Sequence, residues 1–334
     1  MLDFLAVYIQ NWNPVIFHLT ENLALRWYGL AYVAGFVVGY FILKNLSRRK
    51  MWVVPEEKVS DVVTYTAFFG IFLGGRLGYV LFYMIPEHGW AYVFNDPLVI
   101  FRVWEGGMSA HGGALGIFFF TLIYSRMNKI SWTGLGDCIG VVAPIGIIFG
   151  RFANFINGEL YGRVTQGWWG IKFPKSLMEN GQFSDAMAEA AQVNPGVQPL
   201  IDKFGYSGKT LDGVLALARK DPALEQAIGN HVELRHASQL YEGLLEGLLL
   251  FLILYGVRIA FPKLRFGVLS GLYFLLYGIF RIVAEQVREP DASIVFAETW
   301  AEMTKGQFYS VFMILIGLSF IIWAFTRGKR PAAA

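Results

Sequence analysis

The chain has 334 residues, of which 55% are hydrophobic and only 16% are charged. Soluble domains carry about 25% charged residues, so this balance argues against a soluble domain and predicts a protein of the lipid bilayer. The formal net charge of +3 is small and spread along the chain, which argues against nucleic-acid binding, and the single cysteine, Cys138, excludes an internal disulfide and a thiolate metal cluster.

Seven segments have the length and apolar content of a membrane-spanning helix, which needs roughly 20 apolar residues. In chain order they are 23–43, 62–85, 110–126, 134–156, 238–258, 267–287 and 307–325. The N-terminal stretch "MLDFLAVYIQ" has no basic region and no small-residue cleavage site, so we expect mature sequence there and no signal peptide. The sequence therefore predicts an all-α polytopic membrane protein with seven transmembrane helices.

Lysine and arginine residues cluster after every odd-numbered segment. The clusters are "KNLSRRK" after the first, "SRMNK" after the third, "RIAFPKLR" after the fifth and "TRGKR" after the seventh. The short connections after the even-numbered segments are poor in both residues. Because cytoplasmic loops are rich in lysine and arginine, we expect a periplasmic N-terminus and a cytoplasmic C-terminus.

One connection, 157–236, is largely polar and shows short amphipathic helical periodicity. We expect a small extracytoplasmic head that is too short for a large core of its own. A lid or spacer without chemistry is an equally good interpretation of it. The predicted division is 1–156 for an N-terminal arm and helices one to four, 157–236 for the periplasmic head, and 237–334 for helices five to seven with a cytoplasmic tail.

Polar side chains from five of the predicted helices fall at a similar depth, in the outer half of the membrane. At a rise of 1.5 Å per helical residue, these are Tyr28, Arg76, His111, Arg151 and Arg281. A charge at the bilayer centre costs roughly 2.5–3.5 kcal/mol, so such residues face the interior of a bundle or a water-filled cavity. Snorkelling toward the interface is the alternative for Arg76.

Two helices carry these arginines within polar stripes. The stripes are Arg281, Glu285 and Arg288 on the sixth helix, and Arg151, Asn154 and Gly158 on the fourth, with Asn157 and Glu159 at its end. Hydrogen bonds between helices explain Asn157 or Glu285 alone equally well. Two arginines at one depth need an anion, because Glu285 can balance only one of them. A phospholipid phosphate fits, since a guanidinium donates two hydrogen bonds to it.

A histidine, His111, lies between glycine pairs in "GGMSAHGGALG", where the backbone can approach a ligand closely. A lone histidine is more often structural, but its depth beside the arginines favours a general base. The sequence has no HExxH, no phosphate loop and no GxSxG, so neither a metal, a nucleotide nor an esterase is expected.

Six motifs, in order and spread over nearly the whole chain, resemble the bacterial prolipoprotein diacylglyceryl transferase family. They are "RWYGL", "FLGGRLGYVLFY", "FRVWEGGMSAHGG", "GRFANFINGELYGR", "HASQLYE" and "FRIVAEQVREPD". The main departure is the head around residues 175–235, which is longer than the resemblance leads us to expect. For that region the resemblance gives no expectation about structure or function.

The resemblance implies transfer of the diacylglyceryl group of phosphatidylglycerol to the lipobox cysteine of a prolipoprotein signal peptide. The products would be a thioether and glycerol 1-phosphate, no cofactor would be needed, and the protein would lie in the bacterial inner membrane. The catalytic residues expected on this basis are His111, Arg281, Glu159, Asn154 and Tyr28. The phosphatidylglycerol-binding residues expected are Arg151, Asn154, Asn157, Gly162, Glu285, Arg76 and Arg288.

The residues agree with this chemistry. A cysteine thiol has a pKa of about 8.5 and reacts as the thiolate, so a histidine base would assist it. The phosphodiester gains negative charge as its carbon–oxygen bond breaks, and arginines at the phosphate would stabilise that charge. The rival interpretations are a phospholipid transporter or scramblase with an arginine-lined path, a protein that presents lipid to another enzyme, and a metal-dependent headgroup transferase, for which the required aspartate cluster is missing.

Overall fold

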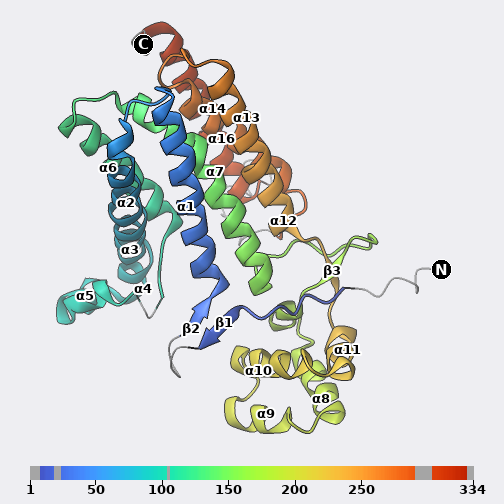
Figure 1. The fold of residues 1–334 in the computed structure, drawn as a ribbon. Helices are drawn as coiled ribbons and strands as arrows, with labels where there is room; N and C mark the ends of the chain where they lie inside the picture. The colour runs from blue at the N-terminus through green and yellow to red at the C-terminus, as the bar shows by residue number, and fades with distance from the viewer. Residues whose placement is uncertain (1–7, 19–23, 104–105, 290–302, 329–334) are drawn as a thin grey trace. The chain divides into compact units, whose positions relative to one another are not determined.

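The computed structural model describes residues 8–18, 24–103, 106–289 and 303–328, and a helix occupies most of each of the seven predicted segments (Figure 1). The first helix begins later than predicted, at Trp27, because Ala24–Arg26 form a short strand. The helices are α1 (Trp27–Arg48), a continuous helix from Glu56 to His88, α6 (Ala110–Met127), α7 (Trp132–Asn157), a continuous helix from Ser238 to Ala260, α14 (Val268–Ala284) and α16 (Lys305–Arg327). The sixth helix is shorter than predicted, because it ends at Ala284 and residues 285–287 form a turn.

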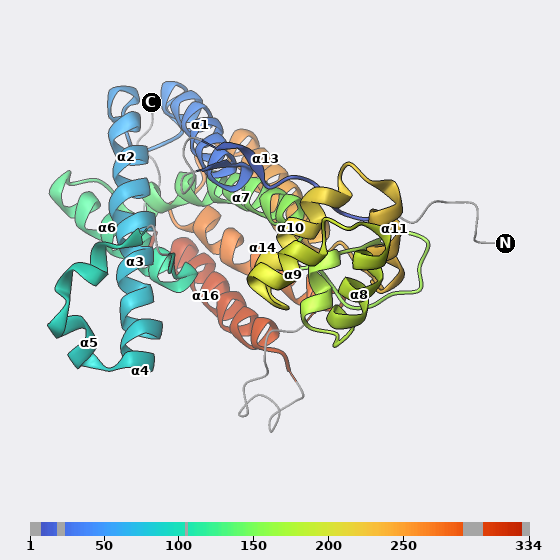
Figure 2. The ribbon, with the colours of Figure 1, turned by 90° about the horizontal axis from the view of Figure 1, so that it is seen from below.

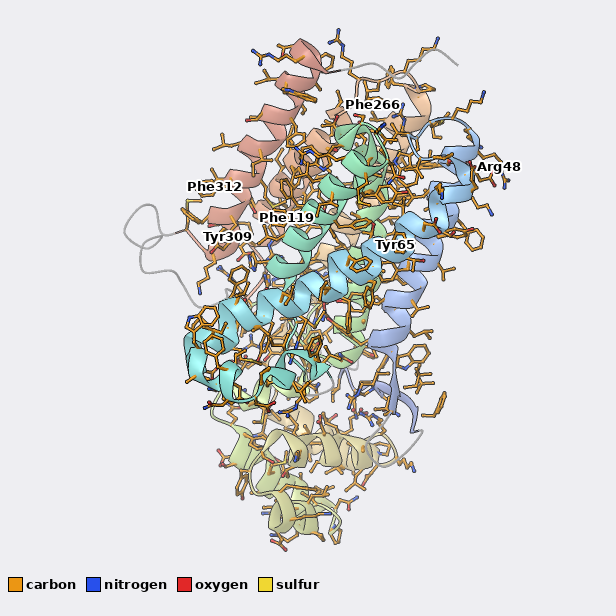
Figure 3. All side chains as sticks on the ribbon, turned by 90° about the vertical axis from the view of Figure 1, so that its left-hand side faces the viewer. Arg48, Tyr65, Phe119, Phe266, Tyr309 and Phe312 are labelled. Carbon is orange, nitrogen blue, oxygen red and sulfur yellow. The ribbon has the colours of Figure 1, made fainter. Side chains whose placement is uncertain are left out.

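Five of these helices are long and apolar enough to cross a membrane: Trp27–Arg48, Glu56–His88, Trp132–Asn157, Ser238–Ala260 and Lys305–Arg327. Large apolar side chains remain exposed along them, and Figure 3 shows two aromatic examples, Tyr65 on α2 and Phe312 on α16. Soluble proteins rarely expose apolar patches of this extent. The all-α polytopic membrane class is therefore confirmed, while the crossing of α6 and of the shorter α14 remains a prediction.

Two of the long helices are interrupted by π-helical turns. The helix Glu56–His88 consists of a 3₁₀ turn (Glu56–Lys58), α2 (Val59–Tyr65), a π-helical stretch (Thr66–Leu73), α3 (Gly74–Tyr79), a second π-helical stretch (Val80–Met84) and α4 (Ile85–His88). The helix Ser238–Ala260 consists of α12 (Ser238–Glu242), a π-helical stretch (Gly243–Leu249) and α13 (Leu250–Ala260). Such interruptions are frequent at functional sites.

The chain divides into two compact units. Unit 1 comprises Met1–Gly35, Pro144–Leu250 and Leu276–Ile314, and unit 2 comprises Phe36–Ala143, Phe251–Leu275 and Leu315–Ala334. Among the predicted site residues, Arg76 and His111 belong to unit 2 and all the others belong to unit 1. The chemistry of the two units is therefore best considered separately.

In unit 2, the helix Glu56–His88 crosses α6 at very close range, as Figure 2 shows for α3 and α6. A Cβ atom on Gly74 would lie 2.7 Å from the Gly112 oxygen and from the Gly116 Cα. Gly70, Gly74 and Gly78 repeat every fourth residue on this helix, and the absence of side chains there allows the close approach. Two short elements, α5 (Trp90–Asn95) and a 3₁₀ turn (Pro97–Phe101), connect the crossing helices.

Unit 1 contains the head, in which four short helices gather (yellow in Figure 1). They are α8 (Phe183–Val193), α9 (Gln198–Phe204), α10 (Gly208–Ala218) and α11 (Pro222–Asn230), preceded by a 3₁₀ turn (Pro174–Met178). The head has its own core of buried residues: Leu177, Phe183, Ala186, Met187, Ala190, Val197, Leu211, Val214, Leu215, Ala218, Leu224, Ile228 and Val232. The amphipathic faces of these helices thus bury one another, which gives the head a more extensive core than we expected.

Short antiparallel strand pairs complete unit 1. β1 (Val15–His18) pairs with β2 (Ala24–Arg26), and β3 (Ile171–Lys172) pairs with β4 (Leu234–Arg235). A parallel bridge joins Ile9 to Lys172, and the buried Asn11 side chain donates to the Leu215 oxygen at 3.2 Å. The arm before α1 is therefore attached to the head.

Candidate active site

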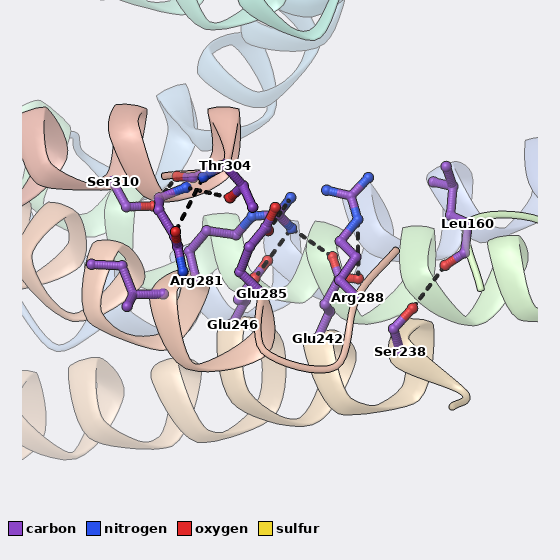
Figure 4. A network of polar contacts seen from close by, with 12 residues as sticks. Leu160, Ser238, Glu242, Glu246, Arg281, Glu285, Arg288, Thr304 and Ser310 are labelled. Carbon is purple, nitrogen blue, oxygen red and sulfur yellow. Dashed lines mark hydrogen bonds and ion pairs between the residues drawn. The ribbon is translucent and has the colours of Figure 1, made fainter. Parts of the chain in front are cut away.

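A buried cluster of arginines and glutamates forms the centre of unit 1 (Figure 4). Nη1 of Arg281 lies 2.7 Å from Oε2 of Glu242 and 3.5 Å from Oε1 of Glu246. Nη2 of Arg281 lies 3.2 Å from Oε2 of Glu285. Nη2 of Arg151, on α7, lies 2.5 Å from the same Glu242 oxygen and 3.9 Å from Oε2 of Glu246. Glu242 thus connects two arginines that come from different helices.

The cluster is balanced in charge, which differs from our expectation. Arg151, Arg281 and Arg288 face three carboxylates, those of Glu242, Glu246 and Glu285, and Nε of Arg288 lies 3.9 Å from Oε1 of Glu242. The side chains of Glu242 and Glu246 are 0% exposed. We expected Glu285 to balance only one arginine, so that an anion would be needed for the other, but two further carboxylates lie within the cluster. Simple charge counting therefore does not require an external anion.

Sequence reasoning missed Glu242 and Glu246 as site residues, although Glu242 ends the motif "HASQLYE". A signal was present, because two glutamates four residues apart in an apolar helix lie on one helix face. In the structure, Glu242 ends α12 and Glu246 lies in the π-helical stretch that follows. Both side chains reach the arginines of α7 and α14.

The contact between Arg281 and Glu285 was expected, but Glu285 lies outside the helix on which it was predicted. Because α14 ends at Ala284, Glu285 and Arg288 lie beyond the helix and do not extend its stripe. Gly306, near the start of α16, leaves the space that the Glu285 carboxylate occupies, since a Cβ there would lie 2.5 Å from Oε2. A close approach to a glycine therefore accommodates this carboxylate.

Arg151 and Arg281 use their guanidinium groups differently. Arg281 directs both Nη atoms to carboxylates, and its side chain is 11% exposed. Arg151 is held through Nη2 alone, and its side chain is 18% exposed. Among the described residues, Nε and Nη1 of Arg151 have no partner. This arginine is fixed by Glu242 and retains donors for a further oxygen ligand.

The end of α7 carries the predicted asparagines. Nδ2 of Asn154 donates to Oε1 of Glu159 at 2.9 Å, and Nδ2 of Asn157 donates to the same oxygen at 3.1 Å. The half-buried Glu159 therefore orients both amides. The turn that makes this possible occurs at Gly158, whose φ of 65° favours glycine.

A glutamine from the N-terminal arm fixes the end of α7. Nε2 of Gln10 donates to the carbonyl oxygens of Phe155 and Ile156 at 2.7 and 3.0 Å. The last carbonyl groups of a helix lack hydrogen-bond donors within the helix, and the buried Gln10 side chain acts as the donor here. Gln10 was not predicted, because nothing in the local sequence shows which helix end it reaches.

Gly162 lies in a segment held between two other parts of unit 1. Its N–H donates to the His236 oxygen at 2.8 Å, and it forms an antiparallel bridge with Arg288. A Cβ on Gly162 would lie 2.8 Å from the His236 Cβ, so no larger residue fits. Tyr28 lies apart from these contacts as the second residue of α1, where its hydroxyl pairs with the Tyr32 hydroxyl at 3.3 Å.

In unit 2, the hydrogen bonds that Arg76 makes to the described residues all go to backbone carbonyl groups. Its contacts are Nε to Ile100 O at 2.7 Å, Nη2 to Val99 O at 2.7 Å, and Nη1 to Gly106 O at 2.6 Å and Gly107 O at 3.0 Å. The side chain is buried, and its guanidinium lies 5.4 Å from the Tyr79 ring centroid. Arg76 thus holds the connection that leads to α6 and does not snorkel.

His111 is the second residue of α6, and its side chain is exposed. The helix begins with Ser109 as its N-cap, whose Oγ accepts from the Gly112 N–H at 3.1 Å. The Ser109 N–H in turn donates to the Gly75 oxygen at 2.9 Å. The position of His111 is therefore fixed by contacts to the helix that carries Arg76.

No group of three or more metal-binding side chains occurs in the part of the chain that the structure describes. Cys138 is buried in unit 2, with Sγ 3.6 Å from the Met51 oxygen, which agrees with an inert packing residue.

Comparison with known proteins identifies the family. The family described as "Prolipoprotein diacylglyceryl transferase" matches residues 14–323. A protein of Shigella boydii serotype 4 named phosphatidylglycerol–prolipoprotein diacylglyceryl transferase is 37% identical over 325 residues, which cover 97% of each chain. Proteins of the same name from Escherichia coli O1:K1 / APEC and from Escherichia coli K12 / DH10B are each 36% identical over the same length and coverage. The chain therefore belongs to the prolipoprotein diacylglyceryl transferase family.

Proposed function

We propose that this protein transfers the diacylglyceryl group of phosphatidylglycerol to the lipobox cysteine of a prolipoprotein signal peptide. The observation that supports it most directly is the state of Arg151, which Glu242 holds through Nη2 while Nε and Nη1 have no partner among the described residues. An arginine with fixed orientation and donors to spare is suited to a phosphate oxygen. The family membership supplies the reaction.

The reaction is a displacement at the glycerol carbon that carries the phosphate. The cysteine sulfur forms a bond to this carbon, the carbon–oxygen bond breaks, and the oxygen leaves with the phosphate as glycerol 1-phosphate. The thiol proton passes to a base, for which we propose His111. The phosphate starts as a monoanionic diester and leaves as a monoester of higher negative charge.

Arg151 stabilises that additional charge, because donors directed at the phosphate interact more strongly with the leaving group than with the substrate. Arg281 supports it from the same cluster, and the carboxylates of Glu242, Glu246 and Glu285 hold both guanidinium groups in place. This preorganisation matters, since donors that are already oriented do not have to rearrange during the reaction.

The other predicted residues receive the following roles in the proposal. Asn154 and Asn157, oriented by Glu159, bind the glycerol headgroup or the ester region, and Tyr28 contributes a hydroxyl to the same substrate. Gly162 and Arg288 hold the segment after α7. Arg76 was predicted to bind phosphatidylglycerol, but its four carbonyl contacts favour a positioning role for the connection before His111.

We further propose that the protein lies in the bacterial inner membrane with its N-terminus in the periplasm and its C-terminus in the cytoplasm. The basic clusters after α1, α6, α13 and α16 support this orientation. Phosphatidylglycerol of the outer leaflet and the cysteine of a translocated signal peptide would then reach the protein from the same side of the membrane.

The test uses protein in detergent, phosphatidylglycerol and a lipobox peptide, with release of glycerol 1-phosphate as the measurement. The variants are His111→Ala and Arg151→Ala, with Arg126→Ala, an exposed residue in the last turn of α6, as the control. Release that requires the peptide cysteine, is lost in both variants and persists in the control supports the proposal. Lipid binding without any release would indicate a carrier or scramblase instead.

A further inference from the structure

Unit 1 contains a pocket of about 630 Å³ between the head and the segment that follows α7. The segment contributes Gly158 to Tyr161, the head contributes residues of the 3₁₀ turn and of α10, and the far side is formed by Arg288 and Glu289. Its volume lies within the range of small-ligand sites, roughly 300–1,000 Å³. Glu159 and Arg288 were predicted as site residues from the sequence, whereas the lining residues from the head were not.

The pocket adjoins the arginine–glutamate cluster at Arg288 and the end of α7 at Glu159. Glu159 lines the pocket and accepts hydrogen bonds from Asn154 and Asn157. Arg288 lines the pocket and lies 3.9 Å from Glu242. A chain bound in the pocket would therefore lead directly to the cluster at which the phosphate is proposed to react.

The lining mixes apolar and charged side chains and carries an excess of negative charge. Four carboxylates face two cationic side chains: Glu159, Glu179, Asp212 and Glu289 against Lys175 and Arg288. Glu289 is paired outside this set, with Nη1 of Arg235 at 2.9 Å. This net negative charge disfavours the phosphate of a lipid or of free glycerol phosphate, because like charges repel. A polar chain with a basic side chain is the complementary ligand.

We propose that this pocket binds the polar residues of the acceptor precursor that directly follow its cysteine, and that it prefers a basic side chain there. The inference rests on the proposed function, because that reaction defines the acceptor as a peptide. It also gives the head a specific role, since one wall of the peptide site is built by α10, the head helix that carries Gly208, Leu211 and Asp212.

One residue allows the pocket to be filled without disturbing the head. Gly208, the first residue of α10, lines the pocket, and a Cβ built on it has no atom within 4 Å. Phenylalanine at this position therefore extends into open space. Gln192, exposed on α8 and outside the pocket, provides a matched position for the same side chain.

The first experiment measures glycerol 1-phosphate release with the full-length enzyme while varying either the peptide or phosphatidylglycerol. Gly208→Phe is expected to raise KM for the peptide by about tenfold and to leave KM for phosphatidylglycerol unchanged. Gln192→Phe is expected to change neither value, and thermal unfolding verifies that both variants are folded. An unchanged peptide KM in a folded Gly208→Phe enzyme would overturn the proposal.

The second experiment tests charge and does not depend on the bulky substitution. Two peptides, identical through the cysteine, carry either lysine or glutamate at the second and third following positions. Exposed charge pairs contribute about 0.2–1 kcal/mol, so Glu179→Gln with Asp212→Asn is expected to raise KM for the lysine peptide about threefold and to lower it for the glutamate peptide. Asp185→Asn, an exposed head carboxylate outside the pocket, is the control.

These results separate the two proposals. Absence of any cysteine-dependent release from the wild-type enzyme would refute the proposed function itself. Release with equal KM for both peptides, unaffected by either set of variants, would keep the transferase and reject the peptide pocket.

Discussion

Two regions of this protein place arginines within apolar helices, and the guanidinium groups have different kinds of partner in the two regions. In unit 1, Arg151 and Arg281 face the carboxylates of Glu242, Glu246 and Glu285. In unit 2, Arg76 faces four backbone carbonyl groups. Carboxylates compensate the charge of a guanidinium, whereas carbonyl dipoles take up its hydrogen-bond donors.

The difference separates a chemical role from a structural one. Arg151 is held at one nitrogen and retains donors, so it can bind a substrate oxygen. Arg76 has four contacts at 2.6–3.0 Å to the connection before α6, so its donors define a loop. The presence of arginine in an apolar segment therefore does not by itself indicate a phosphate site. What the guanidinium already contacts decides its role.

The largest effect is expected from Glu242→Ala. This change removes the carboxylate nearest to both Arg151 and Arg281, and breaking a buried ion pair costs roughly 3–5 kcal/mol. We expect a marked fall in the thermal unfolding temperature in detergent and loss of glycerol 1-phosphate release. Glu246→Ala, whose oxygens lie 3.5 and 3.9 Å from the arginines, is expected to have a smaller effect on both. Equal stability of Glu242→Ala and wild type would contradict the central position of Glu242.

Arg76→Met tests whether the arginine of unit 2 has a structural role. It removes a donor from four carbonyl groups, of which Val99 O still accepts from the Arg102 N–H. Unsatisfied groups cost about 1–3 kcal/mol each without adding fully, so we expect a loss of about 3 kcal/mol in stability. Below its unfolding temperature, the variant should turn over more slowly with an unchanged KM for phosphatidylglycerol. An increased KM for this lipid would instead support a direct lipid contact, as the sequence predicts. Arg126→Met on α6 is the control.

Arg151→Lys isolates the unused donors of that guanidinium. Lysine keeps the charge beside Glu242 but cannot supply Nε and Nη1, so we expect release to fall about 100-fold, which corresponds to about 2.7 kcal/mol of barrier. Thermal unfolding should change little, in contrast to Glu242→Ala. Unchanged turnover would remove the proposed phosphate contact and make Arg151 resemble Arg76.

The smallest effect concerns the head, which lies outside the arginine cluster. The Asn194 side chain, together with the Leu224 and Ala223 N–H groups, lowers the pKa of Asp221, the N-cap of α11. The stability contributed by this carboxylate is therefore present above its ordinary pKa near 3.9 and is lost as the pH falls through the lower folded value. The contact with His231 lowers the pKa of Glu189, which acts with the same sign.

Hydrogen exchange of the Ala223 and Leu224 amides between pH 6 and pH 3 measures this contribution. We expect protection to decline at the acid end in the wild type and to decline less in Asp221→Asn, since asparagine also caps helices but does not titrate. An identical acid response in both proteins would show that Asp221 does not contribute to it. The arginine cluster should be unaffected in either case.

The fold class and several residues of the candidate site were predicted from the sequence. Apolar length indicated the positions of all seven helices, because the requirement for an apolar span is local. Arg151, Asn154 and Glu159 were also identified, since polar side chains in an apolar segment are conspicuous. The ends were less accurate, because α14 stops at Ala284 and the predicted stripe through Arg288 does not continue as helix.

The tertiary structure decided which groups compensate one another. Glu242 and Arg281 are 39 residues apart, Arg76 and the carbonyl groups it binds are 23 to 31 apart, and Gln10 reaches α7 across 145 residues. Helical periodicity and apolar length report on neighbours in the chain, whereas an ion pair or a cap depends on which distant atoms packing brings within about 3 Å. For this reason the sequence by itself determined which residues are polar within the helices, and only packing determined which arginine keeps donors without a partner among the described residues.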